Sequence, residues 1–232
     1  MQHAPVFGKS DESQKGMTHR PISKYLQHLL FLILAGFILL TMLVLVDPLP
    51  KLDIRLSREV QEHRYPELDL VMRGISWAGE LPNTVWVVGV TALWLFAFKY
   101  RREAIYVLLT PLSVLLNTII KFAVNRPRPT PDIVQVLERT RQQSFPSGHV
   151  LFYTVFFGFL ALLMFPLKSL PRIFRYSVTG VCLFLIFTVP LSRIYLGAHW
   201  FTDVSGGFLL GLGCLYLLAY RYLTSGRSAL SE

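Results

Sequence analysis

Long apolar runs alternate with short polar segments along this chain. The first run, residues 29–46, is uninterrupted, and Asp47-Pro48-Leu49-Pro50 ends it. It is longer than a signal-peptide core and lacks a small-residue cleavage site, so we expect a retained helix. Five more runs follow at residues 81–98, 104–124, 150–166, 173–191 and 204–220. Because about 20 apolar residues span a bilayer as a helix, the pattern predicts an all-α, polytopic membrane protein with six transmembrane helices.

Prolines and glycines inside these runs predict how the helices bend and pack. Pro111 is expected to kink the third helix, and Pro190 lies near the end of the fifth. Gly207 and Gly211 lie four residues apart in the sixth run. They form a face of small residues against which a neighbouring helix can pack closely.

The composition fits a single membrane domain. The 232 residues are 53% hydrophobic and 16% charged, which is too apolar for a soluble domain of this length. We expect a disordered cytoplasmic tail over residues 1–28, one membrane domain over residues 29–223 and a short tail over residues 224–232. Cys182 and Cys214 both lie inside apolar runs, so they do not indicate a disulfide framework.

The net charge of +9 raises the question of a nucleic-acid partner. The Lys and Arg residues lie in short loops between apolar runs, not on one face among aromatic residues, so nucleic acid is not expected. The loops at 99–103 and 167–175 are short and rich in basic residues. The positive-inside rule therefore places these loops and both termini in the cytoplasm, and the compact topology suggests a bacterial inner (plasma) membrane.

Residues 51–83 form the longest segment between two apolar runs. Its apolar positions recur at helical spacing, which predicts a short amphipathic, extracytoplasmic segment between the first two transmembrane helices. Two interpretations stay open at this point, a solvated loop with two short helices or a lid that contacts lipid. The positions that carry the pattern are Leu52, Leu56, Val60, Leu68, Val71 and Ile75.

The most reactive side chains return to one face of the membrane. With six crossings, the end of the third run, the start of the fourth, the end of the fifth and the start of the sixth all lie on the same side. These positions carry Lys121, Arg128, Ser147, His149, Arg193, His199 and Asp203. With the basic loops inside, this cluster lies on the extracytoplasmic face.

His199 and Asp203 are four residues apart and share one face if they open a helix. The carboxylate can then accept the Nδ1–H of the imidazole and leave Nε2 free as a nucleophile or base. Taken alone, the pair is equally well explained as a polar contact at the membrane edge. A metal site of His149, His199 and Asp203 is a weaker alternative, because three nearby cations would repel a metal ion.

Three fixed cations, Lys121, Arg128 and Arg193, predict a receptor for a multiply charged anion. Phosphate fits best, because guanidinium groups match its oxygens with paired hydrogen bonds. The tetrapeptide 146–149 (PSGH) lies at a loop-to-helix junction, where free N–H groups can face an anion. By itself it would be an ordinary helix start. Two histidines suit a two-step displacement, with His199 attacking phosphorus and His149 protonating the leaving oxygen.

These motifs together resemble a known signature. It comprises Lys121 with six residues before Arg128-Pro129, then the PSGH tetrapeptide, then Ser192-Arg193 with five residues before His199 and three more before Asp203. The pattern is similar to the three-part signature of the type 2 phosphatidic acid phosphatase family, and every signature position matches. The motifs cover residues 121–203. Arg126-Pro127 is a second Arg-Pro pair, but the spacing from Lys121 selects Arg128.

The resemblance implies a membrane lipid-phosphate phosphatase without metal or cofactor; six spans argue against the soluble haloperoxidase branch of the family. His199 would form a phosphohistidine, oriented by Asp203, and His149 would protonate the leaving group. The phosphate would be held by Lys121, Arg128, Ser147, Gly148 and Arg193. Candidate substrates are phosphatidic acid, phosphatidylglycerol phosphate and undecaprenyl diphosphate. A lipid phosphotransferase with the same intermediate and, less favoured, a transporter of anions or lipids remain alternatives.

Overall fold

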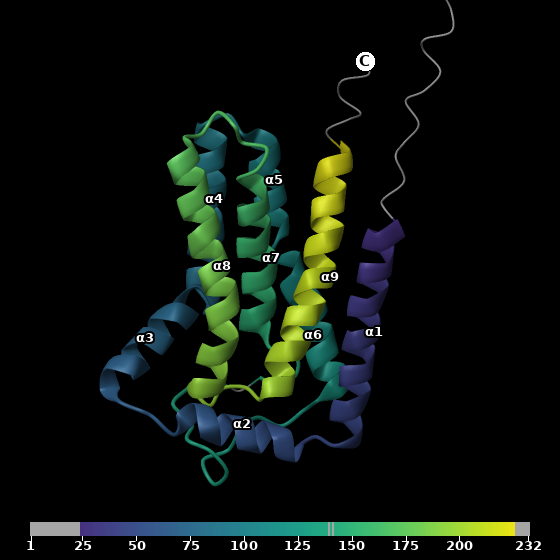
Figure 1. Ribbon diagram of the computed structural model, residues 1–232, viewed down its shortest axis with the longest axis vertical. Coiled ribbons are helices and arrows are strands. Elements are labelled where there is room, and N and C mark those ends of the chain that lie inside the picture. The colour runs from purple at the N-terminus through teal and green to yellow at the C-terminus, as the bar shows by residue number, and fades with distance from the viewer. Residues whose placement is uncertain (1–23, 139, 141, 226–232) are drawn as a thin grey trace, which may run out of the picture.

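A computed structural model describes residues 24–138, 140 and 142–225. This part of the chain is helical and contains no strand, which confirms the all-α prediction. Most of its helices run side by side along the long axis of the molecule (Figure 1). In chain order they are α1 (Lys24–Val46), α2 (Lys51–Gln61), α3 (Pro66–Ser76), the 3₁₀ turn η1 (Trp77–Gly79), α4 (Asn83–Ala97), α5 (Arg101–Leu109), α6 (Leu112–Val124), α7 (Gly148–Leu163), α8 (Arg172–Tyr195) and α9 (Phe201–Ser225).

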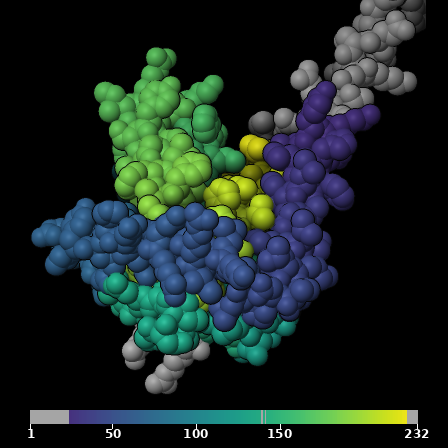
Figure 2. Space-filling view, turned by 60° about the horizontal axis from the view of Figure 1, so that its bottom comes forward, coloured from purple at the N-terminus to yellow at the C-terminus, as the bar shows by residue number. Residues whose placement is uncertain are grey.

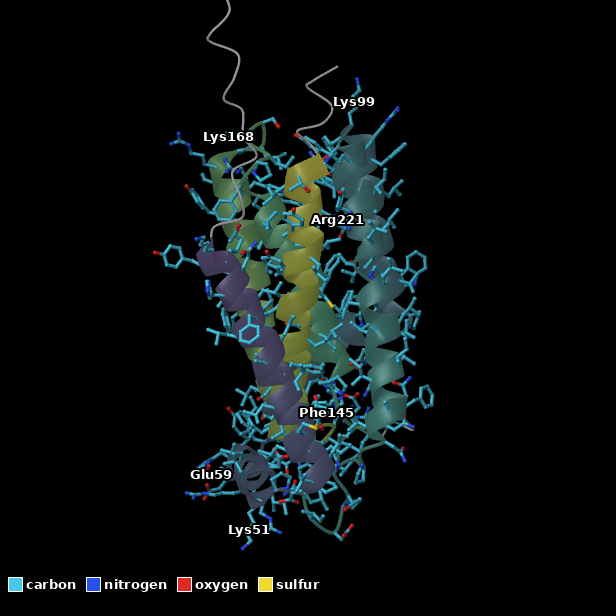
Figure 3. The ribbon with its side chains drawn as sticks, turned by 90° about the vertical axis from the view of Figure 1, so that its right-hand side faces the viewer. Lys51, Glu59, Lys99, Phe145, Lys168 and Arg221 are labelled. Carbon is cyan, nitrogen blue, oxygen red and sulfur yellow. The ribbon has the colours of Figure 1, made fainter. Side chains whose placement is uncertain are left out.

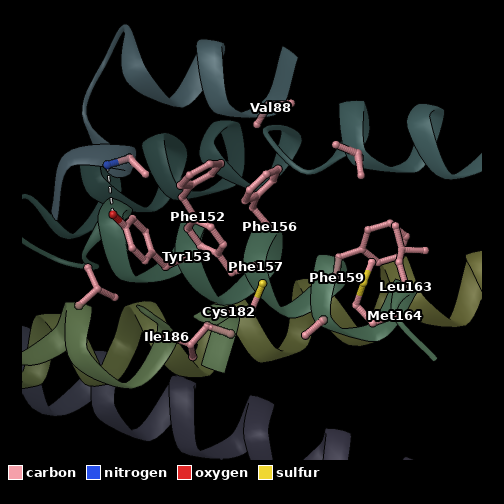
Figure 4. Close-up of a cluster of buried hydrophobic side chains, with 14 of the residues drawn as sticks. Val88, Phe152, Tyr153, Phe156, Phe157, Phe159, Leu163, Met164, Cys182 and Ile186 are labelled. Atoms are coloured by element: carbon pink, nitrogen blue, oxygen red, sulfur yellow. Dashed lines mark hydrogen bonds between the residues drawn. The ribbon is translucent and has the colours of Figure 1, made fainter. Parts of the chain in front are cut away.

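Helix α7 is the centre of the bundle, and α8 and α9 pack along it (Figure 1). Eleven of its 16 residues are buried. Its aromatic side chains form the core with residues of α4 and α8 (Figure 4). The small-residue face predicted in α9 is used for this packing, because a Cβ on Gly207 would lie 2.5 Å from the Ser147 carbonyl oxygen and one on Gly211 2.7 Å from the Thr154 Cβ.

Four segments are long and apolar enough to cross a membrane: Lys24–Val46, Arg101–Val124, Arg172–Tyr195 and Phe201–Ser225. A fifth arises if Pro66–Gly79 and Asn83–Ala97, bent by 61°, form one broken span. Helix α7 is shorter than these four segments. Its burial allows this, because little of its surface needs to contact lipid. The predicted kink at Pro111 is present as the break between α5 and α6. The count of six spans stays a prediction.

The segment between the first two predicted spans folds as α2, α3 and η1. Helix α2 runs across one end of the bundle, below α8, α9 and α1 (Figures 1 and 2). Its buried residues are polar, namely Asp53, Ser57 and Gln61, at four-residue spacing. Leu52, on the apolar side, is exposed. The segment is therefore more than a solvated loop, because its polar face packs against the protein.

The two ends of the bundle carry different residues: basic loops lie at one end and the motifs at the other. Lys99, Lys168 and Arg221 lie toward one end, and Phe145, beside the PSGH tetrapeptide, lies toward the other (Figure 3). The basic loops and the motifs are thus at opposite ends, as the predicted topology requires. Helix α1 begins at Lys24 and includes the last residues of the expected tail; residues 1–23 and 226–232 lie outside the described part of the chain.

Candidate active site

The predicted site residues come together at one end of the bundle. Lys121 lies at the end of α6, Arg193 at the end of α8, and His199 just before α9. Ser147, Gly148 and His149 form the start of α7, so four helix ends meet here through two connections, α6–α7 and α8–α9. Buried residues of the group, each under 5% exposed, are Lys121, Ser147, Arg193, His199 and Asp203.

His199 and Asp203 lie close together, although His199 Nδ1 makes no hydrogen bond to the carboxylate in the described structure. The His199 Nδ1 lies 3.4 Å from the Asp203 Oδ2, and both side chains are almost fully buried. Helix α9 begins at Phe201, so the imidazole precedes the helix and the carboxylate lies in its first turn. Oδ2 also accepts the Trp200 N–H at 2.9 Å. This hydrogen bond caps the start of α9 and fixes the position of the carboxylate.

A buried network holds the second oxygen of Asp203. Arg126 donates from NH1 to the Asp203 Oδ1 at 2.5 Å and from NH2 to the Asp53 Oδ2 at 2.7 Å. All three side chains are fully buried. Asp53 belongs to α2 and also accepts the backbone N–H of Thr202 at 2.9 Å. Helix α2 therefore reaches the reaction centre through two charged residues, and Ser144 adds a hydrogen bond to the Asp203 Oδ2.

Arg128 and Lys121 border the other side of the imidazole. The NH1 of Arg128 lies 3.5 Å from the His199 Nε2 and donates to the Ala198 carbonyl oxygen at 2.6 Å. Lys121 donates from Nζ to the Gln143 carbonyl oxygen at 2.5 Å. Besides the contact of Arg128 with His199 Nε2, the partners of both cations are carbonyl oxygens in the described structure. Neither cation is paired with a carboxylate there.

Arg193 is paired with a residue that the motifs do not contain. Glu138 accepts from NH1 at 2.7 Å and from NH2 at 2.6 Å, a two-point ion pair. The loop that carries Glu138 is tied to the turn after α8, where its N–H donates to the Leu196 carbonyl oxygen at 3.3 Å. Gly197 makes this approach possible: its φ is +63°, and a Cβ there would lie 2.1 Å from the Gln135 carbonyl oxygen.

Several buried polar atoms have no hydrogen-bond partner among the described residues. They are Ser147 Oγ, His149 Nε2, Arg193 Nε and His199 Nδ1 at the site, with Asn117 Oδ1 nearby and Ser57 Oγ on α2. Leaving a buried polar group unpaired costs free energy. Ser147 Oγ, Arg193 Nε and a protonated His149 Nε2 can each donate a hydrogen bond to a phosphate oxygen. Gly148 leaves room beside them, since a Cβ would lie 3.1 Å from the Asn117 Nδ2.

The electrostatic surroundings keep His199 neutral. Burial lowers the pKa of its imidazole well below the usual value, and the positive charges of Arg128, Lys121 and Arg193 lower that pKa further. A neutral imidazole has a lone pair on one ring nitrogen. With Nδ1 facing the Asp203 carboxylate, that lone pair belongs on Nε2, the atom next to Arg128.

A metal ion has two possible sets of ligands here. Donor atoms of Glu80, Glu138 and His149 lie within 4.8 Å of one another. Glu138 already binds Arg193, however, which competes with a cation for the same oxygens. In the alternative set of His149, His199 and Asp203, both oxygens of Asp203 accept hydrogen bonds from Arg126, Ser144 and Trp200.

A cavity of about 310 Å³ lies on the outer side of the site, between Arg128 and Glu138. It is large enough for phosphate and water. A larger hollow of about 870 Å³ lies between α2 and residues 131–135 and contains none of the predicted site residues. Of the two, only the smaller cavity is lined by a predicted site residue, Arg128.

Fold and site together define a membrane-embedded protein with a phosphate-sized anion site around a histidine–aspartate pair. The chain belongs to the PAP2 superfamily, because the model of that family matches residues 102–227. This confirms the family predicted from the sequence and, with it, a membrane phosphatase that acts on lipid phosphates.

Relatives of known name agree with this assignment. Phosphatidylglycerophosphatase B of Bacillus subtilis is 30% identical over 86% of this chain and 93% of its own length. An undecaprenyl-diphosphatase of Sulfolobus acidocaldarius is 30% identical over 55% of this chain and 58% of its own. The crystal structure of a transmembrane PAP2-type phosphatidylglycerolphosphate phosphatase from Bacillus subtilis has the same fold, with a TM-score of 0.74 and 24% identity over 82% of this chain and 94% of that one.

Proposed function

We propose that this protein removes the terminal phosphate of a membrane lipid through a phosphohistidine on His199. The observation that supports this most directly is the surroundings of His199. Its Nδ1 faces Asp203, and its Nε2 lies beside Arg128 near partnerless buried atoms of three site residues. A nucleophile, its orienting carboxylate and an anion site are thereby adjacent to one another.

The reaction balances in two steps. In the first, Nε2 of His199 forms a bond to phosphorus while the bond to the lipid oxygen breaks, and His149 gives a proton to that oxygen. Burial and the positive charge of Arg193 lower the pKa of His149 well below its usual value, so His149 takes up this proton together with the anionic substrate. In the second, neutral His149 takes a proton from water, whose oxygen attacks phosphorus. The bond between phosphorus and the His199 Nε2 breaks, which releases inorganic phosphate and restores the imidazole. The phosphoryl oxygens are held by Lys121, Arg128 and Arg193, with Ser147 and the start of α7 at Gly148. These groups stabilise the charge that is spread over the phosphoryl oxygens in the transition state.

The substrate panel that tests this function contains phosphatidic acid, phosphatidylglycerol phosphate and undecaprenyl diphosphate. The names of the relatives include the second and third of these. Purified protein is expected to release inorganic phosphate from lipids with a kcat/KM about 10²-fold above that for glycerol phosphate or glucose phosphate, because the lipid chain adds binding energy. Equal efficiency on the soluble phosphates would contradict a lipid phosphatase. Transfer to a second lipid without phosphate release would favour the phosphotransferase.

The proposed topology has six spans, cytoplasmic termini and the site on the extracytoplasmic face of the inner membrane. Its support is the placement of the basic loops and the motifs at opposite ends of the bundle (Figure 3). Single cysteines at Gln142 and Ser169, with Cys182 and Cys214 replaced, are expected to react with an impermeant maleimide from opposite sides. Labelling of Ser169→Cys from outside intact cells would invert the orientation.

A further inference from the structure

Two carboxylates lie beside His149, the residue to which the proposed mechanism assigns protonation of the leaving group. The donor atoms of Glu80, Glu138 and His149 lie within 4.8 Å of one another. The 3₁₀ turn η1 closes over the imidazole, because a Cβ on Gly79 would lie 2.4 Å from the His149 Cδ2. The Ala78 N–H donates to the Tyr153 hydroxyl at 3.2 Å and holds this turn against α7 (Figure 4). Glu80 directly follows this turn and is thereby fixed near the imidazole of His149.

Glu138 can keep its place when phosphate binds. It occupies NH1 and NH2 of Arg193, whereas the Nε of that guanidinium is buried and has no partner among the described residues. Phosphate can therefore take the Nε–H of Arg193 without displacing Glu138. The carboxylate then stays beside the leaving group during the reaction.

The cations around the site are already partly compensated. Glu138 pairs with Arg193, and the carboxylates of Asp53 and Asp203 both pair with the single guanidinium of Arg126, which leaves one negative charge over. Glu80 adds another negative charge beside His149. Lys121 and Arg128 donate to carbonyl oxygens and not to carboxylates. The site therefore has little positive charge left for a second phosphate.

From this arrangement we infer that Glu80 and Glu138 make the enzyme selective for lipid phosphate monoesters over lipid diphosphates. The inference rests on the proposed function, because it needs His149 on the leaving-group side. In a diphosphate, the oxygen that His149 protonates is bonded to a second phosphorus, whose charged oxygens then lie beside both carboxylates. In a monoester, the same oxygen is bonded to carbon, and no like charges meet.

The test compares phosphatidic acid with diacylglycerol diphosphate, which share the same lipid and differ by one phosphate. Wild-type protein is expected to have the higher kcat/KM on phosphatidic acid. Glu80→Gln removes one negative charge and should raise kcat/KM for the diphosphate about tenfold, while the value for phosphatidic acid changes less than about threefold. Glu80→Ala should shift the ratio in the same direction without the amide, and serves if Glu80→Gln purifies poorly.

Glu59→Gln is the matched control, because Glu59 is an exposed residue of α2, 55% accessible, and should leave the ratio unchanged. A ratio that stays at the wild-type value in both Glu80 variants would overturn the selectivity inference and leave the proposed phosphatase in place. A wild-type preference for the diphosphate would do the same. Absence of phosphate release from either lipid would remove the proposed function and this inference with it.

Discussion

His199→Ala is expected to abolish phosphate release, lowering kcat by about 10⁴-fold or more, as loss of a catalytic nucleophile does in other enzymes. The reason is structural as well as chemical. Among the described residues, the His199 Nε2 is the nitrogen with an orienting carboxylate at the other ring position and Arg128 beside it. His149→Ala should lower kcat by about 10²–10⁴-fold, the range typical of positioned proton transfer.

The measurement is initial-rate phosphate release by purified variants, accompanied by their melting temperatures in detergent. His63→Ala is the control, because His63 is exposed between α2 and α3 and should retain wild-type activity. Loss of activity in His199→Ala with an unchanged melting temperature supports the nucleophile assignment. Full activity in that variant would remove it, whatever the behaviour of His149→Ala.

Asp53→Asn should reduce both stability and turnover, although Asp53 lies outside every sequence motif. The change removes one of the two carboxylates that compensate the buried Arg126 guanidinium. Removing one partner of a buried ion pair typically costs about 3 kcal/mol, which corresponds to a melting temperature lower by roughly 5–10 °C. Because Arg126 also holds Asp203, we expect kcat to fall about tenfold or more while KM changes little.

Glu59→Gln on the same helix is again the matched variant. Its ion pair with Arg55 joins two largely exposed side chains, and such pairs contribute little to stability. Arg126→Lys adds a second measurement, because an ammonium group keeps the charge but cannot reproduce the fork of donors to Asp53 and Asp203. Asp53→Asn with wild-type melting temperature and kcat would show that α2 does not position the catalytic pair.

The motif residues could be located from the sequence because they lie at the ends of apolar runs. Hydropathy indicates where a run ends, and parity then decides which ends share a face. Lys121, Arg193 and His199 are brought together by this rule alone. The length of α7 could not be predicted in the same way, because a helix buried by its neighbours and a helix in lipid have the same apolar composition.

Asp53 and Glu138 could not be predicted because their partners are distant in the chain. In α2, Leu52, Leu56 and Val60 have the same four-residue spacing as Asp53, Ser57 and Gln61. The apolar stripe suggests a contact, and Val60 does pack against the core, but the fully buried stripe is the polar one. The position of Arg126, which binds Asp53, accounts for this. The motif spacing selects Arg128 and not Arg126, because it describes phosphate contacts and not the support of Asp203.

The salt-bridge network has a consequence for how enzymes of this type can be recombined. The segment that defines the family, residues 102–227, contains Arg126 and Asp203 but neither Asp53 nor Pro48, whose carbonyl oxygen accepts from the Arg126 Nε at 2.9 Å. Cut from the residues before it, this segment would leave a buried guanidinium with half of its partners missing. A chimaera between two relatives therefore needs α2 and the family core from the same parent. The residues that support the catalytic pair extend beyond the signature motifs.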